Sequence, residues 1–410
     1  MVHIEIITTT LDNGLTVISK SQQCNSVTIS FLVKAGCFQE TKDNLGIAHL
    51  VEHMLFKGTE TRTSFQITNE IDSIGGVLNA ETSTEHTRYY CTVCSDYWKT
   101  AFDILSDMLI NNVIDDVELK KEKQVVIEEL NSYADDPMSF THELLIRRSN
   151  QNNINRQYIG GTTKSVAQIS PKQIEEFKST YYTANNIVLV ATGNINHEEL
   201  INEAKKIKFK YPNKSIPKQE FIPEKLGKIY TVEKPIIQSH LMLGFFGGIP
   251  KNDYHIMDVV EVLLGGNFSS RLYQKIREEL GLSYTVSCDC MFFSDGSFFN
   301  IYAGLDNKNL KLALEKILQV VQEVKTSYIS DEELDGVKKY IKGTHLISLE
   351  STSRQNSWLC KALLTNTAIS SEEYIENIFN VSKDDIKTFL NKYFKKENIC
   401  IVRLTNQQKV

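Results

Sequence analysis

The residues with the clearest chemical potential are His49, Glu52 and His53, which form the pattern H-x-x-E-H. We expect a helix from Ala48 to Gly58, and on a helix residues three and four positions apart share one face. Two imidazoles one turn apart can hold Zn²⁺, and a carboxylate between them can reach a water molecule bound to the metal. The pattern therefore predicts a zinc site. The alternative is a surface helix that happens to carry two histidines and a glutamate.

A third ligand is expected from a second helix, between Lys120 and Leu130, which is rich in charge and contains no glycine or proline. Glu122 and Glu129 are two turns apart and so lie close to one face. One of them could bind the metal while the other accepts a hydrogen bond from a ligating imidazole. The composition of the helix does not choose among Glu122, Glu128 and Glu129, and a solvated acidic face is the alternative.

With these spacings the chain resembles the pitrilysin/insulinase clan of zinc peptidases (the inverzincins), and within it the bacterial relatives of the mitochondrial processing peptidase beta subunit. In that clan a glutamate ligand follows the second histidine by a spacing that falls on Glu129, and a further glutamate seven residues earlier falls on Glu122. The resemblance implies that His49, His53 and Glu129 bind one zinc ion per chain. It makes Glu52 the general base and gives Glu122 a supporting role behind the ligands.

The resemblance extends to the stretch Gly75 to Ser83, which looks like the clan's edge strand. Substrate lies beside this strand in the clan, so Asn79 and Ala80 are implied to form backbone hydrogen bonds with an extended peptide. Without the resemblance, the same residues read as a plain, half-exposed strand. The stretch Asp135 to Pro137 follows the ligand helix as it does in many bacterial members.

A third match begins at Gly265 to Leu272 and leads to Arg277 and Tyr284, which correspond to the clan's Arg-x₆-Tyr pair. The resemblance implies that Arg277 holds the substrate backbone and that Tyr284 assists at the developing oxyanion. By themselves the two would read as ordinary surface residues. In single-chain clan members two homologous halves close around a chamber, and this chain has the size of one half. We therefore expect a homodimer in which Arg277 and Tyr284 act in trans on the zinc site of the other subunit.

An internal repeat divides the chain. Residues 170–190 recur 212 positions later (382 − 170), with a serine helix cap, a tyrosine–aromatic pair and a short apolar strand in both copies. We expect a zinc-binding peptidase domain at 1–209, a linker at 210–226 that is rich in proline and lysine, and a homologous domain without metal at 227–410.

The second domain offers an internal comparison for the metal site. Its helix near residues 258–264 contains no pair of histidines four apart, and His255 has Val259 where a second ligand would stand. We therefore expect the zinc site in the first domain alone.

Each domain combines strands and helices, which predicts an α+β fold with a largely antiparallel sheet and helices on one face. The resemblance implies a duplicated α/β roll. The clearest strands are expected at 27–33, 88–94 and 187–192, and the clearest helices at 65–74, 99–111 and 171–182.

Composition sets limits on the function. The 45 basic and 51 acidic residues give a formal net charge of −6, with no basic run, so neither nucleic acid nor a membrane surface is an expected partner. From the residues at its start we expect no signal peptide, and no apolar run has the length expected of a bilayer-spanning helix. Eight irregularly spaced cysteines suggest reduced thiols in the cytoplasm, with Cys91 and Cys94 as strand residues and not as a redox or zinc pair.

These observations favour a zinc-dependent endopeptidase that acts on short or unfolded polypeptides inside a chamber. A dedicated processing peptidase that removes N-terminal presequences is the second hypothesis. The acids with which the mitochondrial enzyme recognises a presequence arginine fall here on Ser139 and Glu143, and the missing acid argues against strict recognition of arginine. The third hypothesis is a structural or binding subunit without activity. Such clan members break the zinc pattern, which is intact here.

Overall fold

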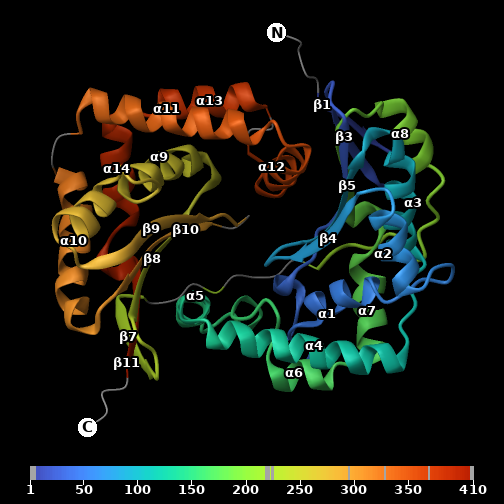
Figure 1. The fold of residues 1–410 in the computed structure, drawn as a ribbon, viewed down its shortest axis with the longest axis horizontal. Helices are drawn as coiled ribbons and strands as arrows, with labels where there is room; N and C mark the ends of the chain where they lie inside the picture. The colour runs from blue at the N-terminus through green and yellow to red at the C-terminus, as the bar shows by residue number, and fades with distance from the viewer. Residues whose placement is uncertain are drawn as a thin grey trace. The chain divides into compact units, whose positions relative to one another are not determined.

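The computed structural model describes residues 6–217, 222, 226–293, 296–326, 329–367 and 370–406. The chain forms two compact units, and each has its own sheet and hydrophobic core (Figure 1). Unit 1 comprises Met1–Ser132, Ile154–Glu220 and Ser348–Lys361, and unit 2 comprises Tyr133–Asn153, Phe221–Ile347 and Ala362–Val410.

The sheet of unit 1 has six strands in the order β1-β2-β6-β3-β5-β4. Only β2 and β6 pair in parallel, and every other pair in this sheet is antiparallel. The strand β4 pairs with β5 alone and forms one edge of the sheet, as the resemblance implied. The strands are β1 (Ile6–Thr10), β2 (Thr16–Ser21), β3 (Ser26–Val33), β4 (Val77–Thr82), β5 (Thr87–Cys94) and β6 (Ile187–Gly193).

The central strand β3 shows how the two faces of this sheet differ. Val27, Ile29 and Phe31 are buried in the main core of unit 1, where they join the apolar side of α1. Thr28 and Ser30 lie on the opposite face, because successive strand residues point to opposite sides. The helices of the unit are α1 (Ile47–Leu55), α2 (Ser64–Asp72), α3 (Trp98–Ile110), most of α4 (Asp116–Asp135), α6 (Thr163–Gln168), α7 (Pro171–Tyr181) and α8 (His197–Ala204).

The polar face of the same sheet is covered by the first part of α12 (Thr352–Thr365), which comes from the far end of the sequence. Asn356 of this helix is completely buried. Its Oδ1 accepts a hydrogen bond from the Ser30 hydroxyl at 2.6 Å, and its Nδ2 donates to the carbonyl of Val190 at 3.0 Å. A buried amide with these partners fixes the segment 348–361 to the sheet of unit 1.

Unit 2 contains a five-stranded sheet in the order β7-β11-β8-β10-β9, in which only β7 and β11 are parallel. Its helix α5 packs on β8 and β11, on the face away from the main core of the unit. The strands are β7 (Lys228–Lys234), β8 (Ser239–Ile249), β9 (Ser283–Met291), β10 (Ser297–Leu305) and β11 (Ile399–Asn406). The helices are α5 (Pro137–Ser149), α9 (Tyr254–Leu264), the π-helical η6 (Tyr273–Glu279), α10 (Leu310–Thr326), α11 (Asp331–Ser348), α13 (Ser371–Asn380) and α14 (Lys383–Tyr393).

The compact units differ from the continuous domains 1–209 and 227–410 expected from the sequence. Residues 133–153 of the first half belong to unit 2, and residues 348–361 of the second half belong to unit 1. Each sheet therefore has helices on its main face and one more helix on its second face. The sequence predicted helices on one face of each sheet, and it did not predict that each half would place a segment on the sheet of the other half.

The two units repeat the same topology. The strands β7 to β11 take the places of β2 to β6 in the sheet order, so β1 is an addition to unit 1. Equivalent hydrogen bonds are found in the two units at positions 212 residues apart. Nδ2 of Asn186 donates to the carbonyl of Tyr181 at 2.9 Å, and Nδ2 of Asn398 donates to that of Tyr393 at 3.0 Å. The α+β class and the duplicated sheet-and-helix architecture predicted from the sequence are confirmed.

Candidate metal centre

The H-x-x-E-H residues lie on α1, which packs its apolar side against the sheet of unit 1. The helix begins after Gly46, whose φ of 88° is in the left-handed region that favours glycine. It ends at Leu55, earlier than the predicted Gly58. The N–H of Phe56 closes the last turn on the carbonyls of His53 and Met54, and Gly58 itself has a φ of 141°.

The three residues expected to bind zinc come together in unit 1. One ligand atom from each of His49, His53 and Glu129 lies within 4.8 Å of the others. Oε2 of Glu129 is 3.7 Å from Nε2 of His49 and 3.5 Å from Nε2 of His53. Ligands about 2.1 Å from a tetrahedral zinc ion are separated by about 3.4 Å. The donor set and its spacing therefore fit zinc, with a fourth position left for water or substrate.

The three candidate glutamates of α4 lie in different environments. Glu129 stands with the imidazoles, whereas Glu128 is exposed. Glu122 is buried, with Oε2 3.1 Å from Nδ1 of His53 and Oε1 2.6 Å from Nζ of Lys57. A carboxylate at Nδ1 orients the ring so that Nε2 faces the other ligands. Lys57, which the sequence did not single out, forms an ion pair with this carboxylate and holds it in place.

His49 has a different environment from His53. Burial and the neighbouring His53 lower the pKa of His49 to about 4, while Glu129 opposes that shift. Its Nδ1 is buried and has no hydrogen-bond partner among the described residues. The neutral imidazole favoured by this environment is the form that binds a metal ion.

Glu52 lies between the ligands on the same helix and contacts β4. Its Oε2 accepts a hydrogen bond from the Thr82 hydroxyl at 2.5 Å. Burial raises the pKa of Glu52, and the hydrogen bond from Thr82 lowers it in part. A carboxyl group whose pKa is moved toward neutrality is suited to proton transfer. Thr82 is a residue that sequence reasoning missed, although its place at the end of the edge strand was the available signal.

Asn79 and Ala80 lie in the middle of β4, opposite Tyr90 and Tyr89 of β5. Side chains on this strand alternate between exposed and half-buried, and Asn79 is exposed. Its Oδ1 accepts a hydrogen bond from the N–H of Ala80 at 2.8 Å. The two residues therefore lie at a sheet edge, where a peptide could replace Oδ1 of Asn79 as the acceptor for the N–H of Ala80.

Arg277 and Tyr284 belong to unit 2, in η6 and β9 respectively. The guanidinium carbon of Arg277 lies 5.2 Å from the ring centre of Tyr284 and 4.8 Å from that of Tyr273. Tyr284 is 74% exposed. The structure thus brings the predicted pair together and adds Tyr273, which stands one helical turn before the arginine.

Ser139 and Glu143 lie on α5 of unit 2 and already have local partners. The N–H of Ser139 donates to the Asp136 carboxylate at 2.7 Å, which caps the helix. Glu143 forms an ion pair with Arg147 at 3.5 Å, one turn later. Both contacts are made within α5 or with its capping residue.

The equivalent place in unit 2 has no comparable ligand set. On α9, Asp258 accepts a hydrogen bond from the Tyr374 hydroxyl at 2.9 Å, and His255 is followed four residues later by the buried Val259. Within the parts of the chain that the structure describes, no second group of three metal-binding side chains comes together.

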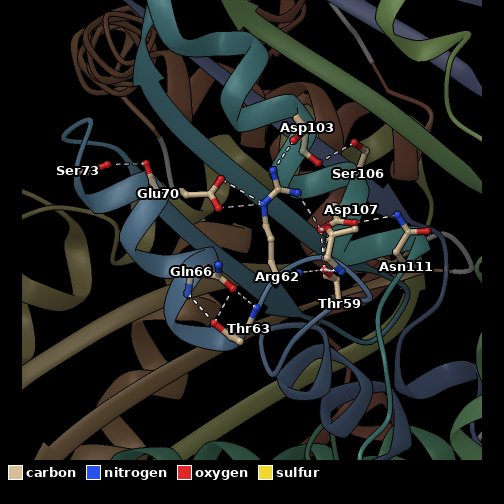
Figure 2. A network of polar contacts seen from close by, with 11 residues as sticks. Thr59, Arg62, Thr63, Gln66, Glu70, Ser73, Asp103, Ser106, Asp107 and Asn111 are labelled. Carbon is tan, nitrogen blue, oxygen red and sulfur yellow. Dashed lines mark hydrogen bonds and ion pairs between the residues drawn. The ribbon is translucent and has the colours of Figure 1, made fainter.

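The loop after α1 is fixed by a polar network that the sequence did not predict (Figure 2). The Arg62 guanidinium lies between three carboxylates: Asp107 at 2.9 Å, Asp103 at 2.6 Å and Glu70 at 3.2 Å. Burial alone would raise the pKa of Asp107, but hydrogen bonds from Asn111, its neighbouring threonines and Arg62 lower it below its usual value. The network ties this loop to α2 and α3.

Two family models match the chain. The model described as insulinase (peptidase family M16) matches residues 16–162, and the one described as peptidase M16 inactive domain matches residues 168–341. The chain is also 35% identical over 355 residues to the uncharacterized zinc protease YmxG of Bacillus subtilis, with 85% of each chain covered. The chain belongs to the M16 family of peptidases. The resemblance to the insulinase clan is thereby confirmed.

Two further proteins are similar to this chain, one in sequence and one in fold. The beta subunit of the mitochondrial-processing peptidase of Saccharomyces cerevisiae is 27% identical, with 98% of this chain and 92% of the relative covered. The crystal structure of a protease from Helicobacter pylori matches with a TM-score of 0.91 and 24% identity, covering 98% of this chain and 99% of the other. Among the helices that the structure describes, none has the length and apolar character needed to cross a membrane.

Proposed function

We propose that this M16 protein is a zinc-dependent endopeptidase. His49, His53 and Glu129 hold the metal, and Glu52 acts as the general base. The observation that carries the proposal is the convergence of three ligand atoms within 4.8 Å, one from each of these ligands, next to an independent carboxylate. The zinc proteases among its relatives support the same activity.

Each residue of the site in unit 1 has a separate role in the proposed reaction. Zinc, when bound, supplies the positive charge that polarises a peptide carbonyl and activates water. Glu52 accepts the proton of the attacking water and returns it to the leaving amine. Thr82 holds one oxygen of Glu52, so the other oxygen stays free for that transfer. Glu122 keeps His53 in the orientation that ligation requires.

The proposed substrates are short or unfolded polypeptides. A peptide can add to the free edge of β4 only in an extended conformation, which a folded protein rarely offers. The N–H of Ala80 would then leave Oδ1 of Asn79 and donate to the peptide. The absence of an acid at Ser139 supports broad specificity over strict recognition of arginine. Presequence processing is the second candidate, favoured by the likeness to the mitochondrial-processing peptidase subunit.

We further propose a homodimer that encloses a chamber, with Arg277 and Tyr284 of one subunit acting on the metal site of the other. The cation–π contact between the two side chains supports their action as one group. Mixing an Arg277→Ala chain with a Glu52→Gln chain tests this arrangement. Sharing in trans restores one competent site per mixed dimer, whereas sharing in cis leaves both sites defective. Eight free cysteines, five of them buried, support a reducing compartment such as the cytoplasm.

The activity is tested with quenched fluorescent peptides in the presence and absence of a zinc chelator. A Glu52→Gln protein of verified zinc content serves as the matched variant. Cleavage that the chelator removes, and that Glu52→Gln lacks despite bound zinc, is the expected result. A zinc-loaded protein that cleaves none of the peptides contradicts the proposal and favours a binding role.

A further inference from the structure

The metal helix α1 is short, and its own sequence supplies little to hold its ends. It has nine residues, and helices of this length are marginal without outside contacts. Its N-cap is Gly46, which has no side chain to satisfy the first N–H groups. The groups that hold the helix must therefore come from other parts of unit 1.

Glu40 performs this task at the start of the helix. Its side chain is buried, and the two carboxylate oxygens accept hydrogen bonds from the N–H of Gly46 at 2.7 Å and that of Ala48 at 3.0 Å. Burial raises the pKa of Glu40, and the two backbone N–H donors oppose that shift, because an ionised carboxylate is an acceptor at both oxygens. The partial negative charge of the two oxygens suits the positive end of the helix dipole. Ala48 directly precedes the ligand His49.

A second buried group holds the other end of the helix. Nδ2 of Asn112 donates to the carbonyl of Met54 at 2.8 Å and to that of Gly58 at 3.3 Å. Oδ1 of the same amide accepts a hydrogen bond from Nζ of Lys178 at 3.0 Å. Lys178 comes from α7 and is 1% exposed. The ammonium group of Lys178 thus fixes the orientation of the Asn112 amide, which holds the last turn of α1.

These contacts bear on metal binding because α1 carries two of the ligands. An atom about 6 Å from the axis of a helix moves by about 1 Å when the helix rotates by about 10°. Functional constellations must be held to within about 0.5 Å. A helix held at one end alone could turn by that angle and separate His49 and His53 from Glu129. Core packing of the apolar side of α1 limits its rotation, and the two buried contacts, one at each end, limit rotation and sliding further.

We propose that Glu40 and the Asn112–Lys178 pair are positioning residues for zinc: they fix α1 so that its two imidazoles reach Glu129. The proposal rests on the zinc site of the proposed function. None of the three positioning residues touches the metal or substrate. They act through the ends of the helix and thereby set zinc affinity.

The test compares zinc affinity with folding stability in the full-length protein. Glu40→Gln replaces one acceptor oxygen with an amide donor that faces a backbone N–H. Lys178→Met keeps the length of the side chain and removes the ammonium group. Zinc affinity is measured by competition with a chromophoric chelator, and the Tm of the zinc-free protein is measured alongside. We expect both variants to lose about tenfold in zinc affinity.

Two control variants separate positioning from general stability. Leu200→Ala removes packing from a buried residue of α8, which lies against β2 and does not hold α1. It should lower the Tm and leave zinc affinity within about twofold of the original protein. Lys172→Met removes an exposed lysine from α7 and should change neither quantity.

The measurements distinguish a positioning role from a general effect on stability. Unchanged zinc affinity in Glu40→Gln, or in Lys178→Met if the first variant does not fold, overturns the positioning role. Equal losses in Leu200→Ala and the two test variants also overturn it, because stability alone would then explain the effect. If the original protein binds no zinc, the proposed function itself fails. Selective loss of affinity in the two test variants supports the proposal.

Discussion

Glu122 provides the sharpest test of how the metal centre is built. In the structure its carboxylate joins Nδ1 of His53, at 3.1 Å, to the ammonium of Lys57, at 2.6 Å. Glu122→Gln keeps the size of the side chain but removes its charge. The neutral amide accepts a weaker hydrogen bond from His53 and leaves Lys57 without its ion-pair partner.

The expected loss can be estimated from this contact. A hydrogen bond to a charged group contributes about 1.5–3 kcal/mol. Loss of a carboxylate behind a metal-bound histidine costs about 10–100-fold in metal affinity, which corresponds to the same range of energy. We therefore expect Glu122→Gln to weaken zinc binding by about 10–100-fold while the fold persists, since neither the sheet nor the main core is altered.

Helix α4 supplies both matched controls. Glu128→Gln changes an exposed glutamate six residues along the same helix and should leave zinc affinity unchanged. Glu129→Gln removes a ligand and should cause the largest loss of the three. Zinc affinity is again measured by competition with a chromophoric chelator. If Glu128→Gln weakened binding as much as Glu122→Gln, the reasoning from the His53 contact would be refuted.

Three further variants test other parts of unit 1. Thr82→Val should lower kcat by about tenfold without loss of zinc, because Glu52 loses a hydrogen bond that orients it; unchanged kcat would remove Thr82 from the mechanism. Arg62→Met should cost about 2 kcal/mol of unfolding free energy at pH 7 in urea titrations. The pKa of Asp107 is lowered in the folded protein, so this cost should persist above about pH 4 and shrink as the pH falls further; a cost that is independent of pH would contradict the pairing. Asn356→Ala should cost about 3 kcal/mol, since it leaves buried sheet groups unpaired, and a cost below about 1 kcal/mol would argue against a structural role for that amide.

Much of the local structure followed from the sequence. The strands expected at 27–33 and 187–192 are β3 and β6, and the helix expected at 171–182 is α7 with Ser170 as its cap. These elements have strong local signals, namely β-branched residues, a capping serine and regular apolar spacing. The metal helix was also predicted, but its end was placed too late because the φ of Gly58 depends on the loop that follows.

The exchange of α5 and α12 between the two halves could not be read from the sequence. Each helix reaches its sheet through side chains that look ordinary in isolation, such as Asn356 and Ser30. Polar residues on alternate positions of a central strand usually indicate a solvated face. In this protein they mark a face covered by a distant helix. Long-range pairing of that kind has no local pattern, and the same holds for Lys178 and Asn112.

The relation between the two units leads to a prediction about metal removal. Unit 2 keeps the strand order, the serine caps and the asparagine–tyrosine contacts of unit 1, yet no ligand set is found among its described residues. We therefore expect unit 1 to fold without a metal ion, unlike a zinc finger. Zinc should stabilise unit 1 only by mass action, which gives about 2.7 kcal/mol at a zinc concentration of 100 times the Kd. Protein stripped by a chelator should keep its circular dichroism spectrum and show a Tm lower by a few degrees. Loss of the spectrum on chelation would mean that zinc organises the fold, and the contacts at the ends of α1 could not then be the groups that hold it.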